Sequence, residues 1–274
     1  MSKRPYSVLM PLYKKDNPEW LKISLDSILA QTAKPSEIVI MKDGPLTEEL
    51  DNTLNGYIKT YPDLIVTYQF KQNVGLGKSL NKGIQLCSNE LIARMDADDY
   101  SLPDRCEKQL KVFEDFQDID LVGSNVKEFT GEISNVVSYV KLPEKNEDIV
   151  KFAKKRCPIR HPSLMYKKSA VLRAGNYRNY RHAQDYNLIV HMILTGAKMY
   201  NIQEDLTHMR VSADFYRRRG GWDQFKLVLR LKKEFLDYGF YSFGDFLVSG
   251  VGNAVVCLMP NSLREFIYKK YLRK

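Results

Sequence analysis

The stretch Glu37–Pro45, EIVIMKDGP, is a short apolar run that stops abruptly at a Gly-Pro turn. Glu37–Met41 has the composition of a buried strand, and Gly44 and Pro45 mark a turn that leaves Asp43 at the carboxyl end of that strand. Ligands of open parallel sheets bind at this edge. Asp43 is therefore a ligand-binding residue or an ordinary turn residue, and taken alone its position favours the turn.

The alternation of strand-like and helix-like segments continues on both sides of this stretch. Ser7–Leu12 is another apolar run, and it precedes a helix that Pro18 is suited to begin. Leu64–Phe70 and Leu91–Met95 are two further strand candidates, separated by a helix with one apolar face. This order is typical of βαβ units, so it predicts an α/β, Rossmann-like fold with a mainly parallel sheet and flanking helices.

Composition sets limits on the class of protein. The chain has 274 residues, of which 44% are hydrophobic and 27% are charged, so it can bury a sizeable core and is not a disordered chain. The four cysteines are scattered without a CxxC pair, which indicates reduced thiols and neither a zinc site nor a disulfide scaffold. Phe246–Pro260, the longest weakly polar stretch, is too short to span a bilayer. Pro5–Tyr13 lacks the cleavage site of a signal peptide, so we expect a cytoplasmic protein.

Most of the positive charge lies at the end of the chain. Of the formal net charge of +9, residues 215–274 contribute +7, from 12 Lys or Arg and 5 Asp or Glu. Such an excess predicts a polyanionic partner. A nucleic-acid-binding protein is one alternative, but its charge should line a domain face among aromatic residues, whereas here it interleaves with an apolar tail. We therefore expect no nucleic acid, and a division into a compact unit of residues 1–214 and a basic amphipathic helical extension of residues 215–274.

The sharpest local signal is the acidic cluster that ends Leu91–Asp99, LIARMDADD. In extended backbone Asp96 and Asp98 would converge, while Asp99 would point aside. Converging carboxylates repel one another and suit a hard divalent ion such as Mg²⁺ or Mn²⁺. The alternative is an acidic loop that caps the helix expected near Pro103.

Three other segments carry candidate chemistry. Asn73–Ser79, NVGLGKS, resembles a phosphate loop, but Gln72 stands where that motif needs glycine, so only a helix start remains at which Lys78 and free N–H groups could face a diphosphate. His161 lies in a His-Pro-Ser segment. Asp185 falls in the first turn of a helix, where a carboxylate is either a structural charge or a positioned base, and its spacing leaves both open.

Taken together and in order, six motifs resemble glycosyltransferase family 2: SVLMPLYKKDNPEWLKISLDSILAQT, EIVIMKDGP, QNVGLGKSLNKGI, LIARMDADD, HPSLMYKKSAVLRAGNY and QDYNLIVHMILTGAK. The resemblance runs from Tyr6 to Met209 and is nearest to bacterial enzymes of the amylovoran, capsule and O-antigen type, which extend lipid-linked oligosaccharides. It implies a GT-A fold, with a nucleotide-binding half of about residues 1–100 and an acceptor-binding half of about residues 101–214. It also implies an inverting, metal-dependent transfer from a UDP-sugar.

The resemblance assigns the donor site to the carboxyl ends of the strands. It implies that Pro11 and Tyr13 lie beside the base, that Asp43 contacts uracil and that Asp96 lies near the ribose. It places Lys78 near the nucleotide, at a position where related enzymes often have arginine.

The resemblance also implies the metal ligand, the base and the acceptor contact. Asp98 would bind Mn²⁺ or Mg²⁺, and Asp185 would be the general base, here preceded by Gln184 where the family has glutamate. His161 corresponds to a histidine on the acceptor side. The donor sugar is expected to be galactose or glucose.

The tail has two interpretations. Its basic, apolar sequence suits attachment to an anionic membrane, on the cytoplasmic face, near a lipid-linked pyrophosphate acceptor. Alternatively its apolar residues pack on the catalytic unit. Arg217, Arg218 and Arg219 could face the membrane or bind the acceptor pyrophosphate. A rival enzyme class, the nucleotidyltransferases, would share the nucleotide and the metal but has less need of a base such as Asp185.

Overall fold

A computed structural model of the chain describes residues 4–180, 182–212, 220–261 and 263–264. The first half contains four strands and three helices that alternate along the chain, as the sequence predicts. They are β1 (Tyr6–Leu12), α1 (Pro18–Leu29), β2 (Glu37–Lys42), α2 (Glu48–Thr60), β3 (Ile65–Gln69), α3 (Leu76–Leu86) and β4 (Leu91–Arg94).

The second half adds strands of very different lengths and further helices. They are β5 (Tyr100–Ser101), α4 (Arg105–Asp115), β6 (Ile119–Phe129), β7 (Val136–Val140), α5 (Asn146–Ala153), the 3₁₀ turn His161–Ser163, β8 (Met165–Lys167), α6 (Lys168–Arg173), α7 (Gln184–Leu194) and β9 (Lys198–Arg210). Within the described ranges, nine strands form one sheet in the order β3-β2-β1-β4-β8-β6-β9-β5, with β7 paired to β6.

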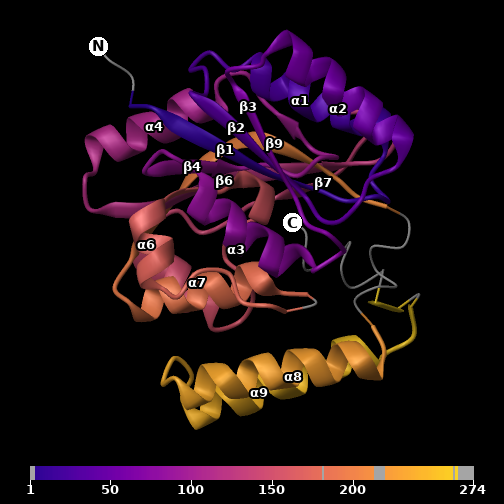
Figure 1. The fold of residues 1–274 in the computed structure, drawn as a ribbon. Helices are drawn as coiled ribbons and strands as arrows, with labels where there is room; N and C mark the ends of the chain where they lie inside the picture. Colours follow the sequence, from indigo (N-terminus) through magenta and orange to yellow (C-terminus); the bar gives the residue numbers. More distant parts are fainter. Residues whose placement is uncertain (1–3, 181, 213–219, 262, 265–274) are drawn as a thin grey trace.

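The four N-terminal strands are parallel, and β1 is buried along its whole length. Continuous burial explains why these strands are apolar runs rather than alternating sequences. Alternate side chains of β1 and β2 pack on opposite sides: Val8 and Ile38 face the side covered by α1, α2 and α4, whereas Leu9 and Val39 face the side covered by α3, α6 and α7 (Figure 1). The expected α/β architecture with flanking helices is confirmed.

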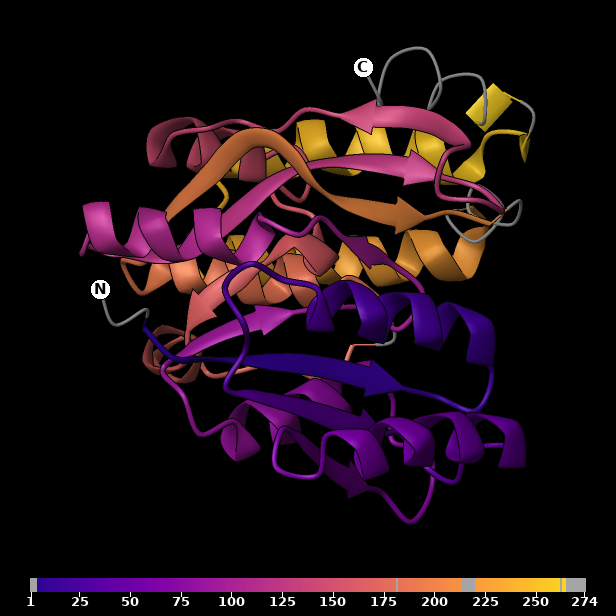
Figure 2. The same cartoon turned by 90° about the horizontal axis from the view of Figure 1, so that it is seen from above.

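The antiparallel strand β8 lies between β4 and β6 and joins the two halves into one sheet (Figure 2). The main-chain N–H of Arg94 donates a hydrogen bond of 2.8 Å to the carbonyl of Leu164, just before β8. The carboxyl end of β4 is thereby fixed beside the segment His161–Ser163 of the second half. This arrangement places the acidic cluster at the junction of the two halves.

Two long helices, α8 (Trp222–Asp237) and α9 (Phe243–Leu258), form an outer layer beyond α7, on the opposite side of the sheet from α1 and α2 (Figure 1). Leu231 and Phe235 of α8 are buried and pack against Tyr186 and Val190 of α7. The second interpretation of the tail therefore holds for this face of α8. None of the helices in the described ranges is both long and apolar enough to cross a bilayer.

Candidate active site

The carboxyl ends of β1, β2 and β4 meet at one edge of the sheet because these strands are parallel. Tyr13, Asp43 and Asp96 follow these three ends directly or within two residues. Pro11 is buried within β1 and pairs with Met41 of β2. The sheet thus brings together four of the five residues assigned to the donor site.

The acidic turn after β4 holds three clustered carboxylates. Asp96, Asp98 and Asp99 each offer an oxygen, and these oxygens lie within 4.8 Å of one another. The expectation that Asp99 points aside is wrong, because the backbone at Ala97 and Asp98 forms a turn instead of continuing as extended strand. Three carboxylates, rather than two, therefore face a common position.

Burial and mutual repulsion disfavour the ionised forms of these acids. Desolvation, followed by the charges of Asp96 and Asp16, raises the pKa of Asp98 to about 7. Burial, followed by Asp98 and Asp96, raises the pKa of Asp99 well above its usual value. Asp99 Oδ2 is buried and has no hydrogen-bond partner in the described part of the chain. A cation would relieve both effects, and a set of carboxylate oxygens fits a hard divalent ion.

Arg94 is the buried neighbour that connects this cluster to the second half of the site. Its guanidinium is fully buried and forms an ion pair with Asp96. Its positive charge also lowers the pKa of His161, after the larger effect of burial. Arg105, likewise buried, donates from Nη2 to the Arg94 carbonyl at 2.8 Å and so fixes the backbone just before the acidic turn.

Arg210, at the end of β9, holds the acidic turn from the other side. Its main-chain N–H donates to Asp99 Oδ1 at 2.7 Å, and its Nε donates to the carbonyl of Asp98 at 3.0 Å. The guanidinium lies over the rings of Trp20 and Phe129, 4.4 and 4.5 Å from their centroids. Sequence reasoning missed Arg210, because only the folded sheet brings β9 beside the turn. It missed Arg94, because its local sequence does not show that this guanidinium is buried.

Asp43 is tied to the loop before α3. Its carboxylate accepts hydrogen bonds from Asn73 Nδ2 at 2.8 Å, from the N–H of Val74 at 2.7 Å and from the N–H of Gly75 at 3.1 Å. A β-carbon at Gly44, where φ is +91°, would lie 2.8 Å from the Asn73 nitrogen, so only glycine permits this approach. A carboxylate has about four acceptor positions, and these contacts leave room for an N–H of a ligand.

The N-terminus of α3 packs directly on the segment that precedes α7. A β-carbon at Gly77 would come within 2.3 Å of the Arg178 carbonyl oxygen, and Asn81 Nδ2 donates to the Tyr177 carbonyl at 2.8 Å. Lys78 lies exposed in this first turn, and no contact joins it to the acidic cluster within the described ranges. The start of α3 and the segment that precedes α7 are therefore in contact.

Asp185 lies in the first turn of α7, as the spacing predicts. Burial raises the pKa of its carboxyl group, while the N–H of Tyr186 and the charges of Arg94 and Arg160 act in the opposite direction. The thiol of Cys157 also donates to this carboxylate, with Sγ 3.9 Å from Oδ2. Because the effect of burial exceeds that of these partners, the carboxylate is more basic than an exposed aspartate and suited to accept a proton.

His161 is buried, and its Nε2 lies 2.9 Å from the hydroxyl of Tyr177. Desolvation holds the pKa of this imidazole well below its usual value, so the ring is neutral at physiological pH. Tyr177 was not singled out from the sequence. Arg217, Arg218 and Arg219 lie outside the described residues.

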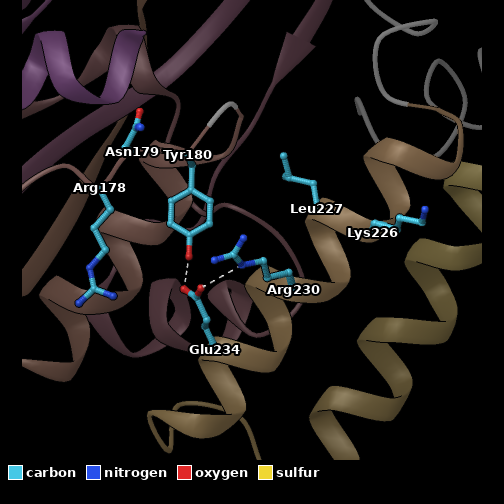
Figure 3. Close-up of a pocket in the computed structure, with 7 residues that line it drawn as sticks. All are labelled: Arg178, Asn179, Tyr180, Lys226, Leu227, Arg230 and Glu234. Atoms are coloured by element: carbon cyan, nitrogen blue, oxygen red, sulfur yellow. Dashed lines mark hydrogen bonds and ion pairs between the residues drawn. The ribbon is translucent and has the colours of Figure 1, made fainter. Parts of the chain in front are cut away.

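A hollow of about 500 Å³ separates the segment before α7 from helix α8 (Figure 3). Arg178 points away from Tyr180, whose hydroxyl donates to Glu234, and Arg230 lies 3.8 Å from the same carboxylate. The residues that line the hollow are Arg178, Asn179, Tyr180, Lys226, Leu227, Arg230 and Glu234. The acidic cluster and Asp185 are not among them.

An α/β sheet with clustered carboxylates at its carboxyl edge can bind a ligand together with a divalent ion. Comparison with known families defines the class further. Residues 7–172 match the family model described as Glycosyl transferase family 2. The chain belongs to this family and is a glycosyltransferase.

Whole-length relatives agree with this membership. The chain is 33% identical to the UDP-Gal:alpha-D-GlcNAc-diphosphoundecaprenol beta-1,3-galactosyltransferase of Escherichia coli, over 98% of this chain and 97% of the relative. It is 33% identical to the amylovoran biosynthesis glycosyltransferase AmsE of Erwinia amylovora, over 97% of this chain and 98% of the relative.

Solved structures agree on the fold. TarS of S. aureus, residues 1–349 in complex with UDP-GlcNAc, superposes with a TM-score of 0.68 at 14% identity, over 96% of this chain and 75% of that chain. The resemblance to family 2 and the GT-A fold that the sequence predicts are confirmed.

Proposed function

We propose that this glycosyltransferase moves a hexose, galactose or glucose, from a UDP-sugar to a lipid-linked diphosphate oligosaccharide during the synthesis of a bacterial surface polysaccharide. The observation that carries the proposal is the position of Arg94. This buried cation forms an ion pair with Asp96 of the acidic cluster, and its charge also acts on His161 and on Asp185. The name of the E. coli relative supports a UDP-sugar donor and a diphosphoundecaprenol-linked acceptor.

In this proposal the donor lies along the carboxyl edge of β1, β2 and β4. Tyr13 and Pro11 border the base, and Asp43 accepts a hydrogen bond from an N–H of uracil while it holds the loop 73–75. Asp96, oriented by Arg94, accepts a hydrogen bond from a hydroxyl of the ribose. Lys78 in the first turn of α3 lies on the side of the diphosphate.

Asp98 would hold the divalent ion, Mn²⁺ or Mg²⁺, with Asp96 and Asp99 close enough to share it. When bound, the ion supplies positive charge to the diphosphate as it leaves. The hydrogen bonds from Arg210 hold the turn in the conformation that directs these carboxylates together.

Asp185 is the proposed general base of an inverting, single displacement. The acceptor hydroxyl oxygen forms a bond to the anomeric carbon while the bond from that carbon to the diphosphate oxygen breaks. The hydroxyl proton moves to the Asp185 carboxylate, and the electron pair of the broken bond leaves with UDP. Burial raises the basicity of this carboxylate, and neutral His161 with Tyr177 offers a polar contact to the acceptor.

The proposal assigns catalysis to residues 1–214 and a supporting role to residues 215–274. Because the acceptor carries a lipid, we further propose that the enzyme works as a peripheral protein at the cytoplasmic face of the cell membrane. Arg217, Arg218 and Arg219 are proposed as acceptor-side residues on the strength of their charge alone.

Replacing Asp185 by Asn tests the assignment of the base. Turnover should fall by roughly 10²–10⁴-fold, the usual contribution of a general base, because the amide cannot accept the proton. UDP affinity, measured by calorimetry, should remain unchanged, and Asp63→Asn, at an exposed carboxylate before β3, should behave as wild type. An equal loss of UDP affinity in Asp185→Asn would show that the base is misplaced.

Thermal unfolding tests the donor and the metal. A ligand at about 100 times its dissociation constant stabilises the folded state by about 2.7 kcal/mol, so UDP with Mn²⁺ should raise the Tm measurably. GDP and ADP should not, and Asp98→Ala should lose the metal-dependent part of the shift. Absence of stabilisation by any nucleotide with any metal would overturn the donor assignment.

A further inference from the structure

Helix α9 presents an apolar surface to solvent along its whole length. All the exposed residues of α9 are apolar or glycine. Val248 is 77% exposed, Phe243 is 66% exposed and Val251 is 64% exposed. Spacings of three and four residues place them on one side of the helix. The α9 stripe, as we call this surface, consists of Phe243, Leu247, Val248, Val251, Val255 and Leu258.

The polar groups of the same region face inward. Lys232 of α8 is 1% exposed, and its Nζ donates to the carbonyl of Ser249 at 2.8 Å and also to the Ser249 hydroxyl. Asn253 Nδ2 donates to the same carbonyl at 2.8 Å. Arg264 is buried and donates from Nη2 to the carbonyl of Met259 at 2.7 Å. The helix therefore turns its polar side to α8 and its apolar side outward, the reverse of an ordinary surface helix.

An apolar surface of this continuity is unusual on a soluble monomer and marks an interaction site. The chain around it indicates what the site meets. The N–H of Gly221, just before α8, donates to the carbonyl of Cys257 at 2.9 Å, so the start of α8 and the end of α9 lie together. The segments that flank the two helices in sequence are basic: residues 213–219 contain three Arg and one Asp, and residues 265–274 contain four Lys or Arg and one Glu.

We propose that the α9 stripe docks on an anionic phospholipid surface, with α9 lying in the plane of the interface. A helix of 16 residues extends about 24 Å, which suits lying within the headgroup and acyl boundary. Gly220 and Arg264 lie together at one end of the α8–α9 pair, and the basic sequence next to each of them supplies positive charge for anionic headgroups. The choice of lipid over other occupants rests on the proposed function, since a lipid-linked acceptor is presented at such a surface.

The position of the two helices suits this arrangement. Because α8 packs on α7, whose first turn carries Asp185, docking through α9 would hold the proposed base at a fixed height above the membrane. Figure 3 shows Lys226 extending from α8 toward the neighbouring helix, and this exposed side chain is long enough to reach lipid headgroups. The α9 stripe would then be the part of the helical pair that contacts lipid.

The test is flotation of the full chain with phospholipid vesicles. Wild type should float with vesicles of phosphatidylethanolamine and phosphatidylglycerol, and bind less to vesicles of phosphatidylcholine alone. Val248→Glu combined with Val251→Glu should weaken binding at least about tenfold, because each change places a carboxylate in the apolar contact. Val137→Glu is the matched control: Val137 on β7 is 51% exposed and lies outside the stripe, so binding should persist.

Two results of the flotation and sedimentation measurements would overturn the inference. One is binding of the double variant equal to that of wild type, at an unchanged Tm that shows both are folded. The other is a wild type that is dimeric by sedimentation velocity, does not float, and becomes monomeric in the double variant; the stripe would then be an interface between copies of this chain.

Activity assays separate this inference from the proposed function. With a water-soluble, short-chain diphosphate acceptor, the double variant should transfer sugar at the same rate as wild type. With the long-chain acceptor in vesicles, its rate should fall by about the same factor as its vesicle binding. Vesicle binding without transfer to either acceptor would overturn the proposed function while the inference stands. Transfer without vesicle binding would overturn the inference alone.

Discussion

Strand β1 and helix α9 are both apolar, yet they lie in opposite environments. Every residue of β1 is buried, and its neighbours β2 and β4 cover its edges while helices cover both faces. In α9 only Cys257 is buried, although the helix is as rich in valine and leucine as the strand. The difference teaches that an apolar sequence defines a surface that avoids water, whereas the fold decides whether protein or another medium covers it.

Truncation of a leucine in each region should give the largest contrast. Leu9→Ala removes a fully buried side chain of β1 and should lower the free energy of unfolding by about 2–5 kcal/mol, because the cavity is only partly refilled. Leu247→Ala, at a side chain that is 47% exposed, should change it by less than about 0.5 kcal/mol. Urea denaturation of both variants without lipid measures the difference. A comparable loss in Leu247→Ala would mean that protein covers the α9 stripe in solution.

The helical layer itself offers a second, smaller contrast, between the buried Lys232 and the exposed Lys233 next to it. Burial lowers the pKa of Lys232 from 10.5 to about 8, so the folded chain releases this proton more readily than the unfolded chain. Between about pH 8 and pH 10.5 the unfolded state binds more protons, and stability should therefore rise with pH. The expected gain is on the order of 1–3 kcal/mol, and Lys232→Met should remove it.

The control for that pH dependence is Lys233→Met, because Lys233 is exposed and adjacent in sequence. Its stability curve should parallel that of wild type. Equal slopes for wild type and Lys232→Met over the same pH range would show that Lys232 is not desolvated, and the inward-facing polar side of α9 would lose its main support.

The same comparison explains what the sequence could predict. The four parallel strands follow from short apolar runs, which burial on both faces of a sheet requires, and the position of Asp185 in a first helical turn follows from the helical spacing of the apolar residues after it. The carboxyl ends of the strands then located Asp43 and Asp96 at one edge. These are features that neighbouring residues determine.

The missed features depend on contacts between distant residues. β8 has three residues, too few to show a period, yet it joins the two halves of the sheet. Arg210 reaches the acidic turn across more than a hundred residues, and Asp99 joins the cluster because the backbone turns at Asp98. The apolar face of α8 and that of α9 are alike in sequence, and only packing shows that one is covered and the other is not.

The smallest predicted effect tests how firmly the sheet, through Arg210 at the end of β9, holds the proposed metal site. Arg210→Lys keeps the charge and the main-chain bond to Asp99 but removes the Nε bond to the Asp98 carbonyl. Groups that orient metal ligands typically contribute 10–100-fold to affinity, and for this partial loss we expect Mn²⁺ affinity to fall by about tenfold. Titration of Mn²⁺ in the presence of UDP measures it, with Arg173→Lys, at an exposed arginine of α6, as the control. Unchanged affinity in Arg210→Lys would mean that the turn keeps its shape without this side chain, and that Arg94, Arg105 and the main-chain N–H of residue 210 are enough to fix the acidic cluster.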